Sequence, residues 1–160
     1  MIKFMSASWL RRRLGKYAFD DEDEAVFRKH FGSCRVEITR QSLKEFAELG
    51  LCVGYLFAAT LSPAKYKALK IHPAYRRSLE KYFDTYLRAE TKWNAGRVKL
   101  DRKFGIGAHE GVLPGVGDLK KPYFVRRKKI SDGFWNTVNL AVCVRELIIA
   151  DLLADAMGLP

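Results

Sequence analysis

The side chains best suited by type to bind a metal or act in catalysis are three histidines and three cysteines. They are His30, His72, His109, Cys34, Cys52 and Cys143. The histidines lack the HxH and HxxxH spacings of metal ligands, and the cysteines form no CxxC pair. His109 is followed by Glu110, but no nucleophile motif lies near this pair, and adjacent side chains seldom converge on one substrate atom. The sequence therefore predicts no metal, no cofactor and no catalytic residue, which makes the protein non-enzymatic.

A second set of residues with a definable chemistry is a basic run that follows two aromatic residues. The set comprises Tyr123, Phe124, Arg126, Arg127, Lys128 and Lys129. Lysine and arginine contact phosphates, and aromatic rings stack on bases. These residues are therefore the best candidates for contact with RNA or with lipid headgroups. A solvated basic loop accounts for the same residues at least as well.

The N-terminal segment, residues 1–19, is a third candidate for binding. It carries Arg11, Arg12, Arg13 and Lys16 among apolar residues and serines, and it contains no acidic residue. This composition is typical of a mitochondrial targeting segment. The alternative is a basic amphipathic helix that lies on a membrane or on an acidic partner. We treat residues 1–19 as a separate segment and residues 20–160 as a single mostly helical domain.

The positive charge is concentrated in two parts of the 160-residue chain. The net charge is +11, and it is made up of +5 in residues 1–19, −3 in 20–64, +12 in 65–129 and −3 in 130–160. Such basic surfaces attract the phosphates of nucleic acid or anionic lipid, or an acidic protein. The charge by itself does not choose among these partners.

The central apolar segment, residues 49–64, contains no charged residue. Ser42 and Glu45 have the spacing of a capping box, so we predict one central helix over about residues 42–62. Residues 49–64 would span about 24 Å as a helix, against ~30 Å for a bilayer core. The sequence thus leaves open a membrane helix and a buried core helix. The candidate residues are Leu49, Gly50, Leu51, Val53, Gly54, Leu56 and Phe57.

The remaining patterns predict a mostly α fold of four to five helices around that central helix. The acidic run 20–24 is typical of the first turn of a helix. Residues 34–39 alternate between apolar and polar side chains, which predicts an extended segment outside a sheet. Pro73 is expected to open a helix that reaches about Asn94, with Gly96 as its stop. Residues 104–133 are rich in glycine and predict a long basic loop, although the two GxG sequences there complete no nucleotide-binding motif. A last helix is expected over about residues 134–157, capped by Ser131 or Asp132.

Together these features favour a non-enzymatic accessory subunit of a larger assembly. The leading hypothesis is a subunit of a mitochondrial inner-membrane complex, with other protein subunits as partners and anionic lipid as a further one. The alternative is a basic RNA-binding or ribosome-associated protein in the cytoplasm, with RNA as its partner. A third hypothesis is a small soluble bacterial or viral adaptor protein.

Overall fold

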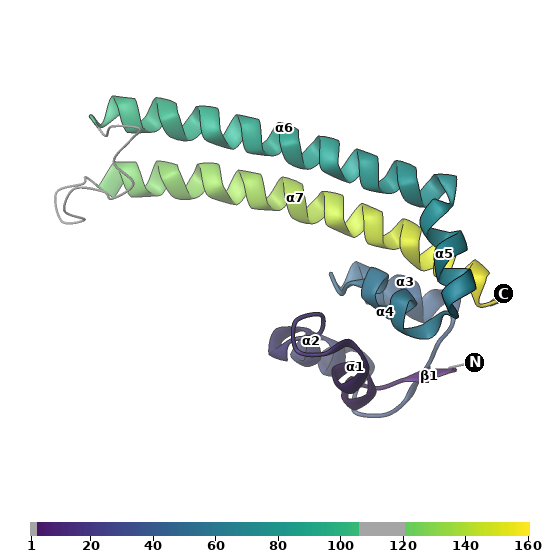
Figure 1. Ribbon diagram of the computed structural model, residues 1–160. Helices are drawn as coiled ribbons and strands as arrows, with labels where there is room; N and C mark the ends of the chain where they lie inside the picture. The colour runs from purple at the N-terminus through teal and green to yellow at the C-terminus, as the bar shows by residue number, and fades with distance from the viewer. Residues whose placement is uncertain (1–2, 106–120) are drawn as a thin grey trace. The chain divides into compact units, whose positions relative to one another are not determined.

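The computed structural model describes residues 3–105 and 121–160, and these are mostly helical (Figure 1). The elements in chain order are β1 (Phe4–Met5), α1 (Ala7–Leu14), α2 (Asp21–Phe31), β2 (Val36–Glu37), α3 (Arg40–Glu48), α4 (Val53–Thr60), α5 (Pro63–Ile71), α6 (Pro73–Lys103) and α7 (Lys121–Ala156). The prediction of a mostly α fold is confirmed. The described residues form seven helices rather than four or five, because the predicted central helix is divided and α5 follows it.

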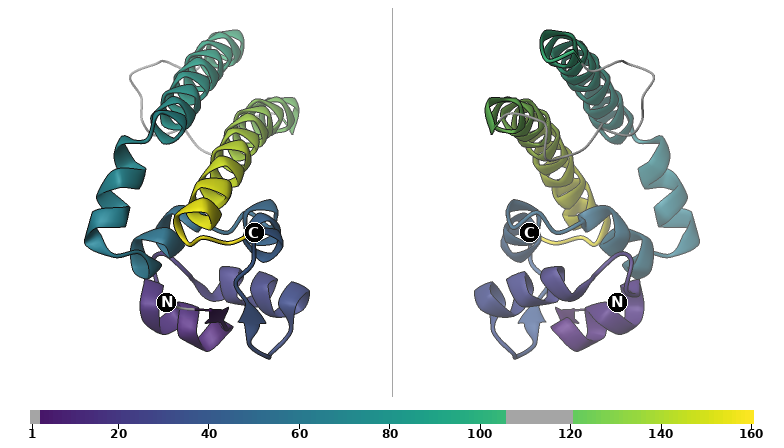
Figure 2. Two further views of the ribbon diagram at one scale, coloured as in Figure 1. Left: turned by 90° about the vertical axis from the view of Figure 1, so that its right-hand side faces the viewer. Right: turned by 90° about the vertical axis from the view of Figure 1, so that its left-hand side faces the viewer.

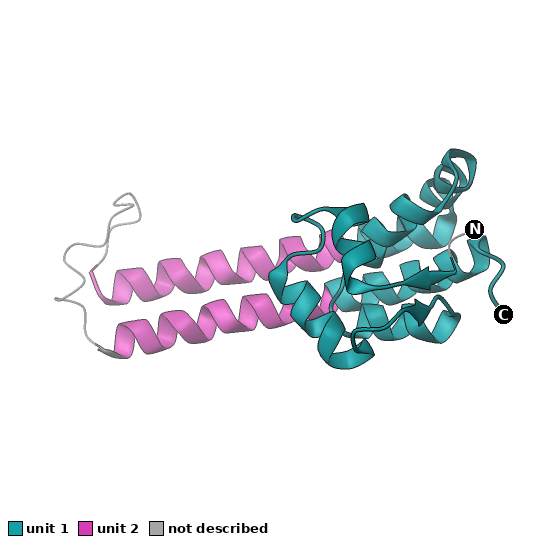
Figure 3. Ribbon diagram, turned by 90° about the horizontal axis from the view of Figure 1, so that it is seen from below, with its two compact units in different colours: residues 1–81, 142–160 teal, residues 82–141 magenta. Residues whose placement is uncertain are grey.

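The chain forms two compact units (Figure 3). Unit 1 comprises residues 1–81 and 142–160, and unit 2 comprises residues 82–141. Helices α6 and α7 each contribute residues to both units. The boundary that the sequence suggested after residue 19 lies inside unit 1, where side chains from both sides of this position share one core.

The two strands pair with each other in unit 1. β1 and β2 are antiparallel, with Phe4 opposite Glu37 and Met5 opposite Val36. The Ile38 amide also donates to the Lys3 carbonyl at 2.7 Å. The prediction that residues 34–39 are extended but outside a sheet is therefore wrong in its second part. The missing partner is a strand of only two residues, which is too short to show alternation in the sequence.

Polar side chains at the N-cap begin α1, α2, α3 and α5. The Asp20 carboxylate accepts from the Asp23 amide at 2.8 Å, and Asp23 accepts in return from the Asp20 amide at 3.1 Å. This reciprocal pair is a capping box that opens α2. Further carboxylates of the acidic run lie in the first turn of α2, where they complement the helix dipole. The prediction that the acidic run opens a helix is confirmed. At the start of α5 the Ser62 hydroxyl oxygen accepts from the Lys65 amide at 3.4 Å, with Pro63 at the first helical position.

The predicted continuous helix over residues 42–62 is wrong, because the chain turns between α3 and α4. Gly50 adopts φ +80°, a left-handed conformation that glycine reaches at little cost. The Gly50 amide donates to Ala47 at 3.0 Å, and the Leu51 amide donates to Phe46 at 3.2 Å. These two bonds form a Schellman motif that ends α3. Gly50 and Gly54 therefore do not share one helix face.

The start of α3 also differs from the prediction. Thr39 is the N-cap, and Ser42 is the residue three positions on that completes a capping box with it. The Ser42 amide donates to the Thr39 hydroxyl oxygen at 3.0 Å, and the Thr39 amide donates to the Ser42 hydroxyl oxygen at 2.9 Å. Serine replaces the usual Glu or Gln of a capping box here, and for this reason the predicted N-cap, Ser42, lies three residues after the actual one.

The N-terminus of α4 is capped from a distant part of the chain. Cys52 occupies the N-cap position, but its side chain makes no capping hydrogen bond. The Gly54 amide instead donates to the Glu146 carboxylate at 3.0 Å. Arg145 also donates to that carboxylate, at 3.0 Å, although the Glu146 side chain is only 1% exposed. Burial and the nearby Glu146 charge raise the pKa of the Cys52 thiol to about 11.

The core of unit 1 collects apolar side chains from the N-terminal segment, the central segment and α7. Phe27 lies at its centre and packs edge-on against Phe19 and Phe46, with ring centroids 6.1 and 6.3 Å away. The edge-to-face geometry suits the positive edge and negative face of aromatic rings. Other fully buried members are Met5, Leu10, Leu43, Leu51, Val53, Leu56, Phe57 and Leu153.

Unit 2 is a pair of antiparallel helical segments from α6 and α7, which lie side by side in Figures 1 and 2. Phe134 of α7 packs against Tyr86 and Trp93 of α6, with ring centroids 5.8 and 5.9 Å away. Farther along, Leu100 and Tyr123 are buried together, with Phe104 and Ile130 packed against them. The large side chains of α6 are thus only partly used between the two helices, since Phe83 and Leu87 are exposed.

Both long helices extend beyond their predicted ends. α6 continues through Gly96 to Lys103, and α7 begins at Lys121 rather than near Phe134. The predicted loop over residues 104–133 is therefore wrong for residues 121–133, which are helical. Burial of Tyr123 and the packing of Ile130 over Gly96 account for the difference, since tertiary packing outweighs the low helix propensity of glycine. His109, Glu110 and the glycines between residues 106 and 118 lie outside the described residues.

Replacing Glu146 by leucine should destabilise the protein by about 2–4 kcal/mol, because the Gly54 amide loses its acceptor in a buried setting. Glu146→Gln keeps an acceptor oxygen and should cost about half as much. Urea denaturation of the full chain at pH 7, followed by circular dichroism, measures both. Glu48→Gln is the matched control: its carboxylate is half exposed, so we expect less than ~0.5 kcal/mol. Equal effects at the two sites would contradict the capping role of Glu146.

Two glycine-to-alanine substitutions should have opposite signs. Gly50→Ala places a Cβ on a left-handed residue and should cost about 1 kcal/mol or more. Gly96→Ala should stabilise α6 by about 0.5–1 kcal/mol, because the added Cβ would lie 3.5 Å from Ile130, an ordinary van der Waals distance. Thermal unfolding of each variant checks the signs. A loss of stability in Gly96→Ala would show that the packing over this position leaves no room for a methyl group.

Candidate functional site

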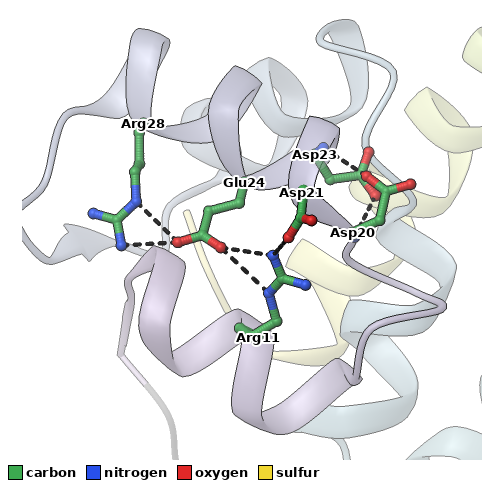
Figure 4. A network of polar contacts seen from close by, with 6 residues as sticks. All are labelled: Arg11, Asp20, Asp21, Asp23, Glu24 and Arg28. Carbon is green, nitrogen blue, oxygen red and sulfur yellow. Dashed lines mark hydrogen bonds and ion pairs between the residues drawn. The ribbon is translucent and has the colours of Figure 1, made fainter.

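The N-terminal basic residues differ in how far the fold uses them. Arg11 of α1 forms an ion pair with Asp21 and donates to Glu24 of α2 at 2.8 Å, while Arg28 donates to the same Glu24 carboxylate at 2.9 Å (Figure 4). The Arg11 guanidinium lowers the pKa of Asp21 and, together with Arg28, the pKa of Glu24. Arg11 is thus engaged in holding α1 against α2.

The other three candidate residues of this segment do not converge on one site. Arg13 donates to the Ala59 carbonyl at 3.1 Å and so links α1 to the end of α4. Arg12 and Lys16 are exposed. The structure therefore gives two of the four candidates an internal partner and leaves two on the surface, which does not make a built anion site.

The central candidates form core rather than a continuous surface. Leu51, Val53, Leu56 and Phe57 are buried in unit 1, with Leu49 packed at the margin of the same core. Among residues 3–105 and 121–160, no helix has the length and apolarity needed to cross a membrane. A mitochondrial inner-membrane location stays a prediction from the sequence.

The candidate run after residue 122 is anchored by Tyr123. Its ring is fully buried, and its hydroxyl donates to the Asp101 carboxylate of α6 at 2.8 Å. Arg97 lies 3.8 Å from the other Asp101 oxygen, and Arg127 donates to the Tyr123 hydroxyl at 3.3 Å. Burial and the bond to Asp101 both raise the pKa of Tyr123. Tyr123 is therefore a packing residue and not a free ring for stacking.

The positive side chains around this anchor form what we call the basic end of unit 2. It consists of Lys99, Arg102, Lys103, Arg126, Lys128 and Lys129, all of which are exposed. In residues 96–105 and 122–131 of the described chain, the one acidic residue is Asp101, whose side chain is bound to Tyr123 and lies near Arg97. Within these two ranges the exposed charges are all positive, and the next acidic residue of α7 is the exposed Asp132, three positions after Lys129.

Sequence reasoning found only half of the basic end. Arg126, Lys128 and Lys129 belong to the predicted run, whereas Lys99, Arg102 and Lys103 come from the part of α6 beyond the predicted stop at Gly96. Repeated basic residues at helical spacing after Gly96 were the available signal. Phe124 is 36% exposed and lies against Tyr123 with ring centroids 5.4 Å apart, so it is the aromatic residue of the run that reaches the surface.

Searches for a related protein give no match. No protein-family model, no curated protein and no solved structure is similar to this chain. Within the described part of the chain, histidine, cysteine and carboxylate side chains also form no group of three that could hold a metal ion.

The acid stability of unit 1 should depend on Arg11. Because the folded state lowers the pKa of Asp21 and Glu24, their contribution is present at neutral pH and is lost as the pH falls below the usual carboxyl range of about 4 and through the lowered folded-state pKa values. Arg11→Gln should remove most of this contribution, so the free energy of unfolding should fall less between pH 7 and pH 3 than it does in the wild type. Burial raises the pKa of Asp23, which acts in the opposite direction in both proteins. Urea unfolding at pH 7 and pH 3 measures the difference, with exposed Arg12→Gln as the control that should keep the wild-type pH dependence.

Proposed function

We propose that this chain is a non-enzymatic RNA-binding protein that contacts the phosphate backbone through the basic end of unit 2. The observation that carries the proposal is the set of six exposed lysines and arginines brought together from α6 and α7 without an exposed acidic residue between them. Neutralising phosphates with such side chains releases counterions from the nucleic acid, which is the main source of sequence-independent affinity.

The internal arrangement of this end supports the proposal. Asp101 is the one carboxylate in the described residues of this region, and its hydrogen bond to Tyr123 turns it inward. The neighbouring guanidinium groups of Arg97 and Arg127 then offset its charge. Asp101 therefore opposes little of the positive potential that a phosphate would meet at the six exposed side chains.

RNA is favoured over a lipid surface by the shape and composition of this end. The exposed apolar side chains of the run are Phe124 and Val125, which lie beside the cationic residues on one α7 turn. An exposed aromatic edge next to lysines and arginines is typical of proteins that stack unpaired bases while holding the backbone. Two residues offer little of the broad apolar face with which an interfacial helix enters a membrane.

The test is the salt dependence of binding to a fluorescently labelled single-stranded RNA of about 20 nucleotides. A triple variant, Arg126→Gln, Lys128→Gln and Lys129→Gln, should reduce the slope of log Kd against log salt by about 2–3 and weaken binding at ~0.1 M salt. Arg127 is kept, because it donates to Tyr123.

The matched control is a second triple variant with the same loss of charge in unit 1, at the exposed residues Lys67, Arg76 and Arg77. It should leave the slope close to that of the wild type. No RNA binding by the wild-type protein, or equal losses in the two triple variants, would overturn the proposal. Far-UV circular dichroism of both variants shows whether the helices are intact.

A further inference from the structure

A groove runs between α6 and α7 in unit 2, beside the basic end, with which it shares Lys99 and Lys129. Its volume is about 480 Å³, within the usual range for ligand sites. It is lined by Ala89, Lys92, Trp93, Ala95, Gly96, Lys99, Lys129, Ile130, Gly133, Phe134 and Thr137. Gly133 contributes to the hollow, because a Cβ there would meet no atom within 4 Å, whereas Ile130 packs over Gly96.

The floor of the groove is apolar, and its charged margin is wholly positive. Trp93, Ile130 and Phe134 supply the large apolar surfaces. The Thr137 hydroxyl is the one side-chain hydroxyl in the lining, and it already donates to the Gly133 carbonyl at 2.9 Å. The charged lining residues are Lys92, Lys99 and Lys129, all exposed.

The dimensions of the groove fit a helix. The lining residues of α6 run from Ala89 to Lys99, which is about 15 Å of helix, and those of α7 run from Lys129 to Thr137, about 12 Å. An amphipathic helix docked in a groove places its i, i+3, i+4 and i+7 side chains over a similar length. Packing of this kind would add a third helix to the two that unit 2 provides.

We infer that this groove binds an amphipathic helix of a protein partner, with apolar side chains on the floor and carboxylates facing the three lysines. Charge complementarity selects an acidic flank, since the lining contains no carboxylate. A nucleobase fits less well, because its polar edges need several hydrogen bonds that this floor does not offer. The inference is independent of the RNA contact, although Lys99 and Lys129 belong to both surfaces.

The test uses two designed helical peptides of about 18 residues that share one leucine face. One carries glutamates on both flanks, and the other carries lysines at the same positions. Fluorescence anisotropy with the full chain should show at least tenfold tighter binding of the acidic peptide. Equal binding of the two peptides, or no binding of the acidic one, would overturn the inference.

A groove-filling variant locates the binding. A Cβ built on Gly133 meets no atom within 4 Å, so Gly133→Leu should enter the groove without disturbing the helix pair. Gly133→Leu should weaken the binding of the acidic peptide at least tenfold. Asn139→Leu, an exposed substitution on the same helix outside the groove lining, should change the affinity less than twofold. Far-UV circular dichroism confirms that both variants fold.

Two other occupants give distinct results. If Gly133→Leu weakens RNA binding as much as peptide binding, the groove is part of the RNA contact and the inference fails. If the wild-type chain is a dimer by light scattering and Gly133→Leu makes it monomeric, the occupant is a second copy of the chain. If the wild-type chain binds the acidic peptide as expected but does not bind RNA, the inference about the groove stands and only the proposed function is overturned.

Discussion

The buried carboxylate of Glu146 connects the two parts of the sequence that form most of the unit 1 core. Helix α4 starts at a cysteine that cannot cap it well, in a segment without polar side chains nearby, so its amides need an acceptor from elsewhere. α7 supplies this acceptor from more than ninety residues away in the chain. Because the interaction is buried, it also fixes which face of α7 meets the central segment, and the apolar side chains around it pack accordingly.

Local signals in the sequence predicted the starts of α2 and α6. The acidic run 20–24 carries its own capping box and Pro73 suits a first helical position, so both could be interpreted without tertiary information. The break at Gly50 was missed because a glycine in an apolar run is compatible with a buried helix, and only the hydrogen bonds of Leu51 and Gly50 reveal a C-cap. The extents of α6 and α7 were missed for the opposite reason. There, Gly96 and Gly133 suggested breaks that the packing between the two helices overrides.

The candidate site shows the same division. Arg126, Lys128 and Lys129 were evident as a run, whereas Lys99, Arg102 and Lys103 join them only because α6 continues to the level of Tyr123. Residue type alone also gave a wrong prediction for side chains whose role is decided by their burial. Tyr123 was a candidate for stacking, yet its ring and hydroxyl are used inside unit 2. Arg11 was a candidate for binding anions, yet it pairs with carboxylates that follow it closely in the chain.

The position of the N-terminal segment in the core has a consequence for the maturation of the chain. Met5, Leu10 and Phe19 are almost completely buried, and β1 supplies the strand that pairs with β2. Proteolytic processing after residue 19 would remove these side chains, leave the ring of Phe27 without one of its partners and free Asp21 and Glu24 from Arg11. The unit 1 core as described therefore depends on residues 4–19, which supply both buried side chains and the partner strand of β2.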